Sequence, residues 1–288
     1  MSYAVIVPVT ATDIKKSPFG FQWLEYFLSR SVKVFMCVNG CSIEEAKAVE
    51  SFYESMPKEF FIVYGGEEPN PYKARNCGLR AAFAHMEVEA VALIDSESII
   101  DQGFDSCVSE VTDFMLCAGR VKTHVPVGVS RHLDWLAEHR FECFDGFNAP
   151  DATMGGNMII GRSIYEFLGP MKEDSISGGD HEYGARAKAR GMRITPIDAL
   201  VFKIIHKYSY RTIMEKQIRR AKNATLAAQP ASEVIPALRA ALLRKADAIG
   251  GCASIEDLKD NYSKVIDGLF SVMWYESLLA SLIDEEPK

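Results

Sequence analysis

Two carboxylates that follow an apolar run are the residues of this sequence best suited to chemistry. Residues 92–94 are apolar, Asp95-Ser96-Glu97 comes next, and the chain then turns apolar again. Carboxylates are rarely fully buried unless they are paired or bind a cation. If the chain is extended here, Asp95 and Glu97 point to one side. Two such oxygen ligands suit Mg²⁺ or Mn²⁺ and leave room for phosphates. A solvated turn is the alternative interpretation.

A group of basic and amide side chains precedes this triplet. Lys73, Arg75 and Asn76 lie at the start of a helix expected over residues 71–86. The free N–H groups in the first turn of a helix attract anions, so these residues suit a ligand that contains phosphate. A charged, solvated first turn would show the same pattern, and both interpretations stay open.

A third candidate, Asp180, opens a later helix. It follows Gly178-Gly179, and the helix is expected to end at Gly191, a natural C′ residue. Glycines let the backbone approach a substrate closely, and a helix N-terminus favours an ionised carboxylate. Aspartate is also a good N-cap, so a purely structural role is the alternative.

The elements that must position these residues alternate along the first two-thirds of the chain. Apolar runs predict strands over residues 3–9, 32–39, 59–65 and 89–95. Helical spacing predicts helices over residues 21–30, 42–56 and 71–86. Ser42 and Glu45 have the spacing of a capping box. The alternation indicates an α/β fold with a mainly parallel sheet. Ligands bind beyond the carboxyl ends of such strands, and Asp95 lies at one of them.

The last part of the chain has a different pattern. From about residue 212 onward the spacing is helical, with interruptions at Pro230, Pro236 and Gly250-Gly251. We therefore predict a helical C-terminal extension over residues 211–288. Its helices offer a surface for a homo-oligomer.

The composition is that of an ordinary soluble protein. The 288 residues are 48% hydrophobic and 25% charged. A net charge of −7 argues against nucleic-acid binding. No apolar run is long enough for a transmembrane segment, which needs about 18 residues. The cysteine count, 7, is odd and includes no CxxC pair, so we expect reduced thiols and a cytoplasmic location.

Taken in order, these motifs form a familiar series. It runs from a strand ending in V-P-V through a K-A-R-N-x-G helix, a strand ending in D-x-E and a G-G-N strand to a G-x-D helix with Arg186. A final strand and His206-Lys207-Tyr208-Ser209 complete it. The series resembles the family 2 glycosyltransferases, inverting enzymes of the GT-A fold that use nucleotide-sugar donors. The resemblance spans residues 3–210. It implies a GT-A-like, Rossmann-type nucleotide-binding domain over residues 1–210, with the donor part in residues 1–100 and the acceptor part in residues 101–210.

The resemblance also implies roles for the residues that match the motifs. Donor binding would involve Pro8, Val9, Thr10, Asn39, Lys73, Arg75, Asn76, Asp95 and Ser96. Mn²⁺ or Mg²⁺ would be held by Asp95, Glu97 and His206. Asp180 would be the general base. Two positions depart from the family pattern: Asn39 stands where many members have an acid, and Gly179 stands where an acid usually precedes the base.

Acceptor binding is expected in the second part of the domain. Residues 124–154 are rich in aromatic side chains, and a flat ring such as Trp135 packs well against a sugar, although core packing is the alternative. The candidate acceptor-binding residues are Trp135, Gly156, Asn157 and Glu182. Glu182 is also the next candidate for the base if Asp180 only caps its helix.

The expected function is therefore that of an inverting, hexosyltransferase-type glycosyltransferase. It would move a sugar from a uridine or thymidine diphosphate donor to a hydroxyl group of a saccharide or small molecule. A catalytically inactive nucleotide-sugar-binding module of the same fold is one alternative, because fold does not fix function. A nucleotidyltransferase is another, but residues 10–20 lack the dense glycines that its first loop would normally show. The GxGxxG pattern of an NAD enzyme is absent there too.

Overall fold

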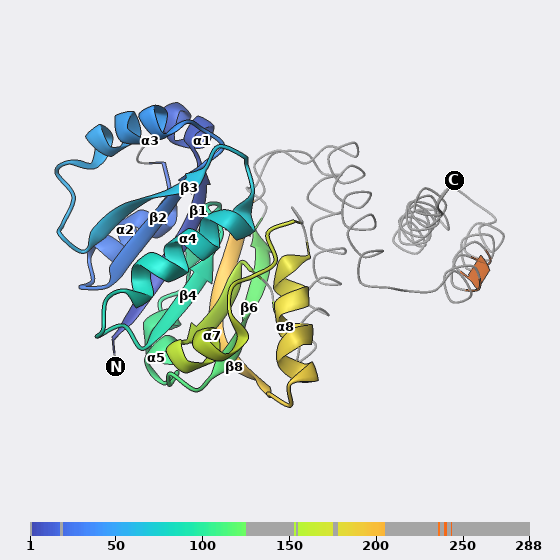
Figure 1. The fold of residues 1–288 in the computed structure, drawn as a ribbon. Coiled ribbons are helices and arrows are strands. Elements are labelled where there is room, and N and C mark those ends of the chain that lie inside the picture. The colour runs from blue at the N-terminus through green and yellow to red at the C-terminus, as the bar shows by residue number, and fades with distance from the viewer. Residues whose placement is uncertain are drawn as a thin grey trace, which may run out of the picture. The chain divides into compact units, whose positions relative to one another are not determined.

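The computed structural model describes residues 2–17, 20–124, 153, 155–174 and 178–204, together with residues 236, 239, 240 and 243. By its contacts the chain divides into two compact units, residues 1–126 with 141–205 and residues 127–140 with 206–288. The sheet and its helices belong to the first unit (Figure 1). Of the helical extension predicted over residues 211–288, only the last four residues named above are described. The extension and the boundary at residue 210 therefore stay predictions.

An eight-stranded sheet with the order β3-β2-β1-β4-β7-β6-β8-β5 forms the centre of this unit. Its strands are β1 (Tyr3–Thr10), β2 (Lys33–Asn39), β3 (Phe60–Gly66), β4 (Ala90–Ile94), β5 (Ser98–Ile100), β6 (Leu116–His124), β7 (Asn157–Gly161) and β8 (Ile194–Ile204). The first four pair in parallel, and β6 pairs in parallel with β8. The pairs β4–β7, β6–β7 and β5–β8 are antiparallel. The predicted α/β class with a mainly parallel sheet is confirmed.

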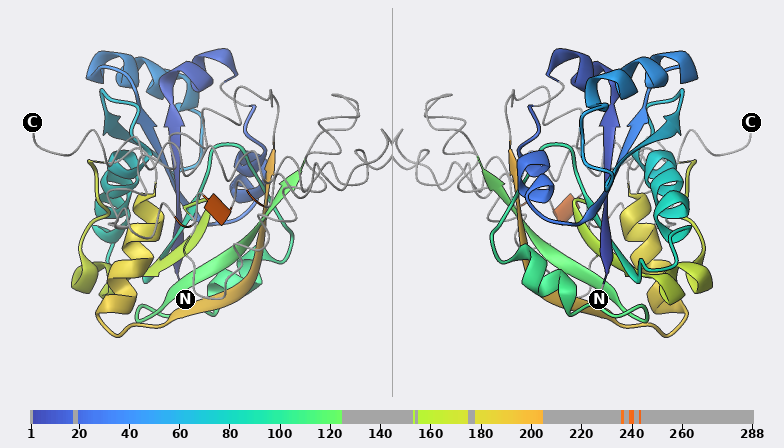
Figure 2. Two further views of the ribbon diagram at one scale, coloured as in Figure 1. Left: turned by 90° about the vertical axis from the view of Figure 1, so that its right-hand side faces the viewer. Right: turned by 90° about the vertical axis from the view of Figure 1, so that its left-hand side faces the viewer.

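Helices cover both faces of the sheet (Figure 2). One face carries α1 (Ala11–Lys16), α2 (Gln22–Leu28), α3 (Ile43–Glu50), the 3₁₀-helix η1 (Ser51–Tyr53) and α5 (Phe104–Ser109). The other face carries α4 (Pro71–Phe83), α7 (Arg162–Leu168) and α8 (Gly179–Ala189). Among the described residues, no helix is both long and apolar enough to cross a membrane.

The first strand shows why its sequence is apolar throughout. Val5 and Val7 pack into the core on one face of the sheet, while Ala4 and Ile6 pack into the core on the other. A strand that is covered on both faces needs an apolar side chain at every position. The continuous run in residues 3–9 is the direct consequence.

Local signals at two helix ends are confirmed. Ser42 Oγ accepts from the N–H of Glu45 (3.2 Å), and Glu45 Oε2 accepts from the N–H of Ser42 (3.1 Å), which completes the capping box of α3. At the end of α8, Gly191 has a positive φ of 77° and its N–H donates to the carbonyl of Lys188 (2.9 Å). The chain therefore leaves α8 at the glycine that the sequence indicated.

Five elements go beyond the sequence prediction: α1, β5, α5, β6 and α7. The three helices have six or seven residues, fewer than two full helical turns, so no 3.6-residue periodicity can develop within them. The strand β6 contains Arg120 and Lys122 on either side of Val121 and ends in Thr123 and His124. Its place is set by pairing with β7 and β8 rather than by its own composition.

Candidate functional site

The chain forms a tight turn directly after β4. The N–H of Ser98 donates to the carbonyl of Asp95 (3.1 Å), and the carbonyl of Ser96 accepts from Trp23 Nε1 (3.1 Å). Asp95 lies at the carboxyl end of β4, as predicted. The expectation of an extended chain through Asp95 and Glu97 is wrong, because side chains in a turn do not alternate as they do in a strand. The metal-binding role of these two residues stays a prediction.

Four of the predicted donor-binding residues lie at the same edge of the sheet as Asp95. Thr10 and Asn39, the last residues of β1 and β2, are partners in the parallel register, and Pro8 and Val9 are buried just before them. Asn39 is also buried, and its amide donates to the carbonyl of Val9 (3.1 Å). Thr10 caps α1 through its side-chain oxygen. The amide of Asn39 therefore ties two strand ends together, and its contact with a nucleotide base stays a prediction.

Arg75 connects α4 to the turn. It is buried, and its Nη2 donates to Asp95 Oδ1 at 2.6 Å. The Asp95 side chain is 25% exposed, so one partner of this ion pair is removed from water and the other is near it. Charge-assisted hydrogen bonds of this length are among the stronger ones in proteins. The structure thus brings together two residues that the sequence had placed in separate motifs.

The glycine pair before β7 runs directly over this ion pair. A Cβ atom at Gly155 would lie 2.8 Å from Arg75 Nη1, and one at Gly156 would lie 3.1 Å from Asp95 Oδ2. Neither distance leaves room for a side chain without movement of its neighbour. A side chain at either position would therefore require Arg75 or Asp95 to shift, because the backbone passes so close to the charged groups.

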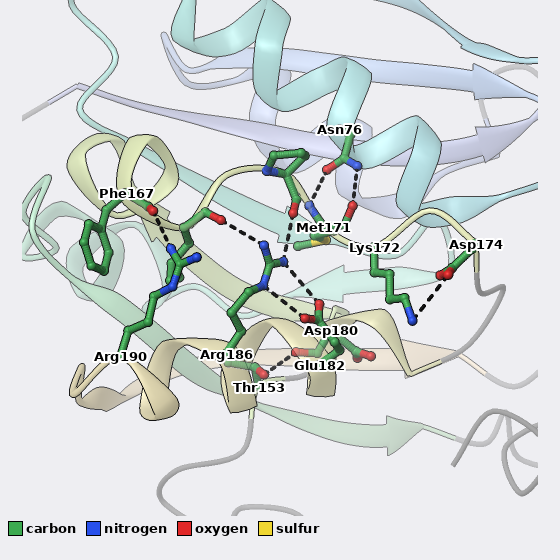
Figure 3. Close-up of polar contacts among 12 residues, drawn as sticks. Asn76, Thr153, Phe167, Met171, Lys172, Asp174, Asp180, Glu182, Arg186 and Arg190 are labelled. Carbon is green, nitrogen blue, oxygen red and sulfur yellow. Dashed lines mark hydrogen bonds and ion pairs between the residues drawn. The ribbon is translucent and has the colours of Figure 1, made fainter. Parts of the chain in front are cut away.

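Asp180 is the second residue of α8, and its carboxylate is held by donors outside that helix. Tyr72 Oη donates to Oδ1 (3.1 Å), and the N–H of Gly155 donates to Oδ2 (2.7 Å). The N-cap position belongs to Gly178, which has a φ of 85°. The alternative of Asp180 as an N-cap is therefore wrong. In addition, Thr153 Oγ1 donates to the backbone carbonyl of Asp180 (2.5 Å; Figure 3).

Asp95 and Asp180 thus border the same dipeptide. Gly155 donates to one carboxylate, and Gly156 packs against the other. Burial is the largest cause of the raised pKa of the Tyr72 phenol, and the negative charge of Asp180 raises this pKa further. The hydroxyl of Tyr72 therefore stays protonated at neutral pH and can act as a donor.

Asn76 belongs to the interior of the fold. Its Nδ2 donates to the carbonyl of Met171 (2.8 Å), and its Oδ1 accepts from the N–H of Met171 (2.9 Å; Figure 3). Nδ2 also donates to Glu173 Oε1 (2.8 Å). Asn70, the N-cap of α4, donates to the carbonyl of Glu173 (2.6 Å). The two asparagines tie residues 170–174, which lead toward α8, to α4. Donor binding by Asn76 stays a prediction.

We expect Asn76→Ala to lower the free energy of unfolding by at least about 2 kcal/mol, because the N–H and carbonyl of Met171 would lose buried partners. Denaturant unfolding followed by circular dichroism would measure the loss. An unchanged unfolding free energy together with weaker nucleotide binding would instead show that Asn76 contacts the donor.

The other predicted donor and acceptor residues have varied surroundings. Lys73 is half-buried, and its stem lies against Gly66 at the end of β3. Asn157 is buried, and its amide donates to the carbonyls of Arg120 and Ala199 (2.8 Å each). Glu182 forms an ion pair with Arg186 (3.0 Å; Figure 3). Trp135 and His206 lie outside the described residues.

Sequence reasoning did not assign a role to Tyr72 or Thr153. A signal for Tyr72 was present, because Tyr72, Arg75, Asn76 and Leu79 have the i, i+3, i+4, i+7 spacing of one helix face. All four are buried. Three polar side chains on the buried face of a helix must find partners, which points to a network around α4.

Of the comparisons with known proteins, only that with solved structures finds similar folds. No protein-family model matches this chain. No curated protein matches its sequence. Among solved structures, the chain is similar to the mannosyltransferase PcManGT from Pyrobaculum calidifontis, solved with GDP-Man and Mn²⁺. The identity is 17% and the TM-score 0.50, and the match covers 99% of this chain and 76% of that one. It is also similar to GalNAc-T7, solved with UDP, GalNAc and Mn²⁺, at 12% identity and a TM-score of 0.52, over 100% of this chain.

These likenesses establish the class of the fold. The chain spans 58% of the length of the GalNAc-T7 chain. It has the GT-A fold, a Rossmann-like α/β fold of nucleotide-sugar glycosyltransferases. Membership of family 2 stays a prediction.

Proposed function

We propose that this protein is an inverting glycosyltransferase of hexosyltransferase type. The observation that carries this proposal is the position of Asp180: its carboxylate is held at the start of α8 next to the same dipeptide that packs against Asp95. Asp95 follows the carboxyl end of β4, the edge at which α/β sheets bind ligands. A donor phosphate near Asp95 and an acceptor hydroxyl near Asp180 would then meet over Gly155-Gly156.

In this proposal Asp180 is the general base. It takes the proton of the acceptor hydroxyl while that oxygen attacks the anomeric carbon. Attack from the face opposite the leaving nucleoside diphosphate inverts the anomeric configuration. A carboxylate has about four lone-pair sites, and each Asp180 oxygen accepts one of the hydrogen bonds described above. Capacity for a substrate proton therefore remains on both oxygens.

The residues of the turn fit a divalent cation. Asp95 and Glu97 supply carboxylate oxygens, which suit Mn²⁺ or Mg²⁺. Within the described part of the chain, no group of three or more His, Cys, Asp or Glu side chains could hold a metal. In the proposal, the diphosphate and water supply further ligands. His206 is a further proposed ligand outside the described residues. When bound, the ion would offset the charge that develops on the departing diphosphate.

The donor class and the acceptor class are part of the proposal. In this proposal Lys73 of α4, half-buried with its stem against Gly66 at the end of β3, would bind a phosphate, while Arg75 holds Asp95. We propose a uridine or thymidine diphosphate sugar as donor and a saccharide or small molecule with a free hydroxyl as acceptor. Thermal-shift measurements with a panel of nucleotides, with and without Mn²⁺, would identify the donor. A bound nucleotide raises the thermal stability, and the rise increases with the ratio of the nucleotide concentration to its Kd.

The main alternative is an inactive binding module of the same fold. The glycine before Asp180, where the family usually has an acid, is the feature that favours it. An assay for release of nucleoside diphosphate separates the two proposals. A binding module would bind the nucleotide sugar and release none.

We expect Glu97→Gln to abolish nucleotide binding that depends on Mn²⁺ and to leave the fold intact. Glu97 is exposed in the turn, so glutamine can replace it without opening the core. The substitution removes the negative charge of a proposed metal ligand. Thermal shift with nucleotide, in Mn²⁺ and in EDTA, would measure the loss. Glu44→Gln, an exposed glutamate of α3, is the matched control. Full activity in EDTA would argue against any role for a metal.

A further inference from the structure

The residue before Asp180 is glycine for a steric reason. A Cβ atom at Gly179 would lie 3.0 Å from three atoms of the Tyr72 ring. Few Cβ atoms approach a neighbour so closely, so a side chain at position 179 would require the ring to move by a few tenths of an ångström. The space next to Asp180 that an acidic side chain would take is thus filled by Tyr72, which is itself buried.

The same tyrosine bonds to the carboxylate of Asp180. Its hydroxyl donates to Oδ1 (3.1 Å), while the N–H of Gly155 donates to Oδ2 (2.7 Å). One donor on each oxygen fixes both the position and the plane of the carboxylate. The Tyr72 ring lies against Gly179, and the central carbon of the Arg75 guanidinium lies 5.5 Å from the ring centre.

We propose that Tyr72 is a positioning residue for the base Asp180 and that it occupies the place of the missing acid. This inference rests on the proposed function, because it assigns a task to the contact between Tyr72 and the base. The Tyr72 hydroxyl orients the carboxylate of Asp180 so that a lone pair faces the acceptor hydroxyl. No bond to Tyr72 is made or broken, and its own proton stays on its oxygen.

The hydroxyl and the ring of Tyr72 can be tested separately. Tyr72→Phe keeps the ring against Gly179 and removes only the donor to Asp180. A hydrogen bond to a charged group is worth about tenfold or more in an equilibrium constant, so we expect kcat to fall about tenfold. The KM for the donor should stay at the wild-type value. The variant should remain folded under the assay conditions, because losing one hydrogen bond to a charged group costs only about 1.5–3 kcal/mol of stability.

Tyr183→Phe is the matched control. Tyr183 is a fully buried tyrosine of α8, the helix that carries Asp180. Among the described residues, its hydroxyl has no hydrogen-bond partner. This variant should therefore leave kcat unchanged, and it reports the effect of removing a buried hydroxyl that does not contact the base.

A double-mutant cycle with Asp180→Asn separates positioning from a general structural role. If Tyr72 acts through Asp180, Tyr72→Phe should not slow the residual reaction of Asp180→Asn any further. An equal loss in both backgrounds, or a wild-type kcat in Tyr72→Phe, would overturn the inference. An impaired Asp180→Asn beside an unimpaired Tyr72→Phe would overturn it alone and leave the proposed function standing. Wild-type turnover in Asp180→Asn, or no turnover in the wild-type chain, would overturn both.

Discussion

Replacing Asp180 by asparagine is expected to slow sugar transfer at least about a hundredfold, because general-base catalysis is typically worth 10²–10⁴ in rate. The fold and donor binding should be kept. The asparagine carbonyl can accept from the N–H of Gly155, and its amide can donate to the hydroxyl oxygen of Tyr72. Both existing contacts therefore retain a suitable partner, and only the ability to take a proton is lost.

The experiment compares initial rates and melting temperatures of Asp180→Asn with those of Asp113→Asn. Asp113 is also partly buried and accepts a hydrogen bond from Ser163 (2.9 Å), but it lies before β6, away from the turn that follows β4. The control should keep its rate. Near wild-type turnover in Asp180→Asn would remove Asp180 from the reaction and make Glu182 the next candidate.

Arg75→Met is expected to lower the free energy of unfolding by about 3 kcal/mol, the lower end of the range for breaking a buried ion pair. The lower end applies because Asp95 is 25% exposed and water can solvate part of its charge. The methionine fills most of the space but leaves Asp95 without the partner at 2.6 Å. Donor binding should fall as well, because the carboxylate that is proposed to bind metal is no longer held in place.

Lys15→Met is the matched control for this prediction. Lys15 pairs with Glu45 at 2.7 Å, but the two side chains are 52% and 48% exposed. Water and salt screen such an exposed pair, so it contributes little to stability. Denaturant unfolding of both variants would measure the difference. The double variant Arg75→Met with Asp95→Asn should recover part of the stability, because no unpaired charge remains. Equal losses in the two single variants would contradict the importance of burial.

The sequence by itself determined the parallel half of the sheet and the ends of two helices. The strands β1, β2 and β4 could be predicted because nearly all their residues are buried, and burial on both faces requires a continuous apolar run. The edge strand β3 is mostly half-buried but is also largely apolar. The caps at Ser42 and Gly191 could be predicted because they are formed by hydrogen bonds among neighbouring residues. Apolar runs and helix caps each involve only a few consecutive residues, so the composition and spacing of a short segment predict them.

Tertiary structure alone decided how the other four strands pair and the detail of the site. The pairing of β4 with β7 joins Ala90 to Gly161, across many residues that no local pattern connects. The triplet at Asp95 was expected to be extended, but it turns toward β5, which finds its partner in β8. Pairing between distant strands depends on the whole fold, and the sequence of a short segment does not predict it.

The contact between Tyr72 and Asp180 is the clearest case. The two residues are 108 positions apart, and they meet because α4 and α8 pack on the same face of the sheet. The sequence named Asp180 from its place beside glycines at a helix start, but it could not show what fills the space of the absent side chain at Gly179. That depends on which ring lies there after packing, and packing is a property of the assembled core rather than of any one segment.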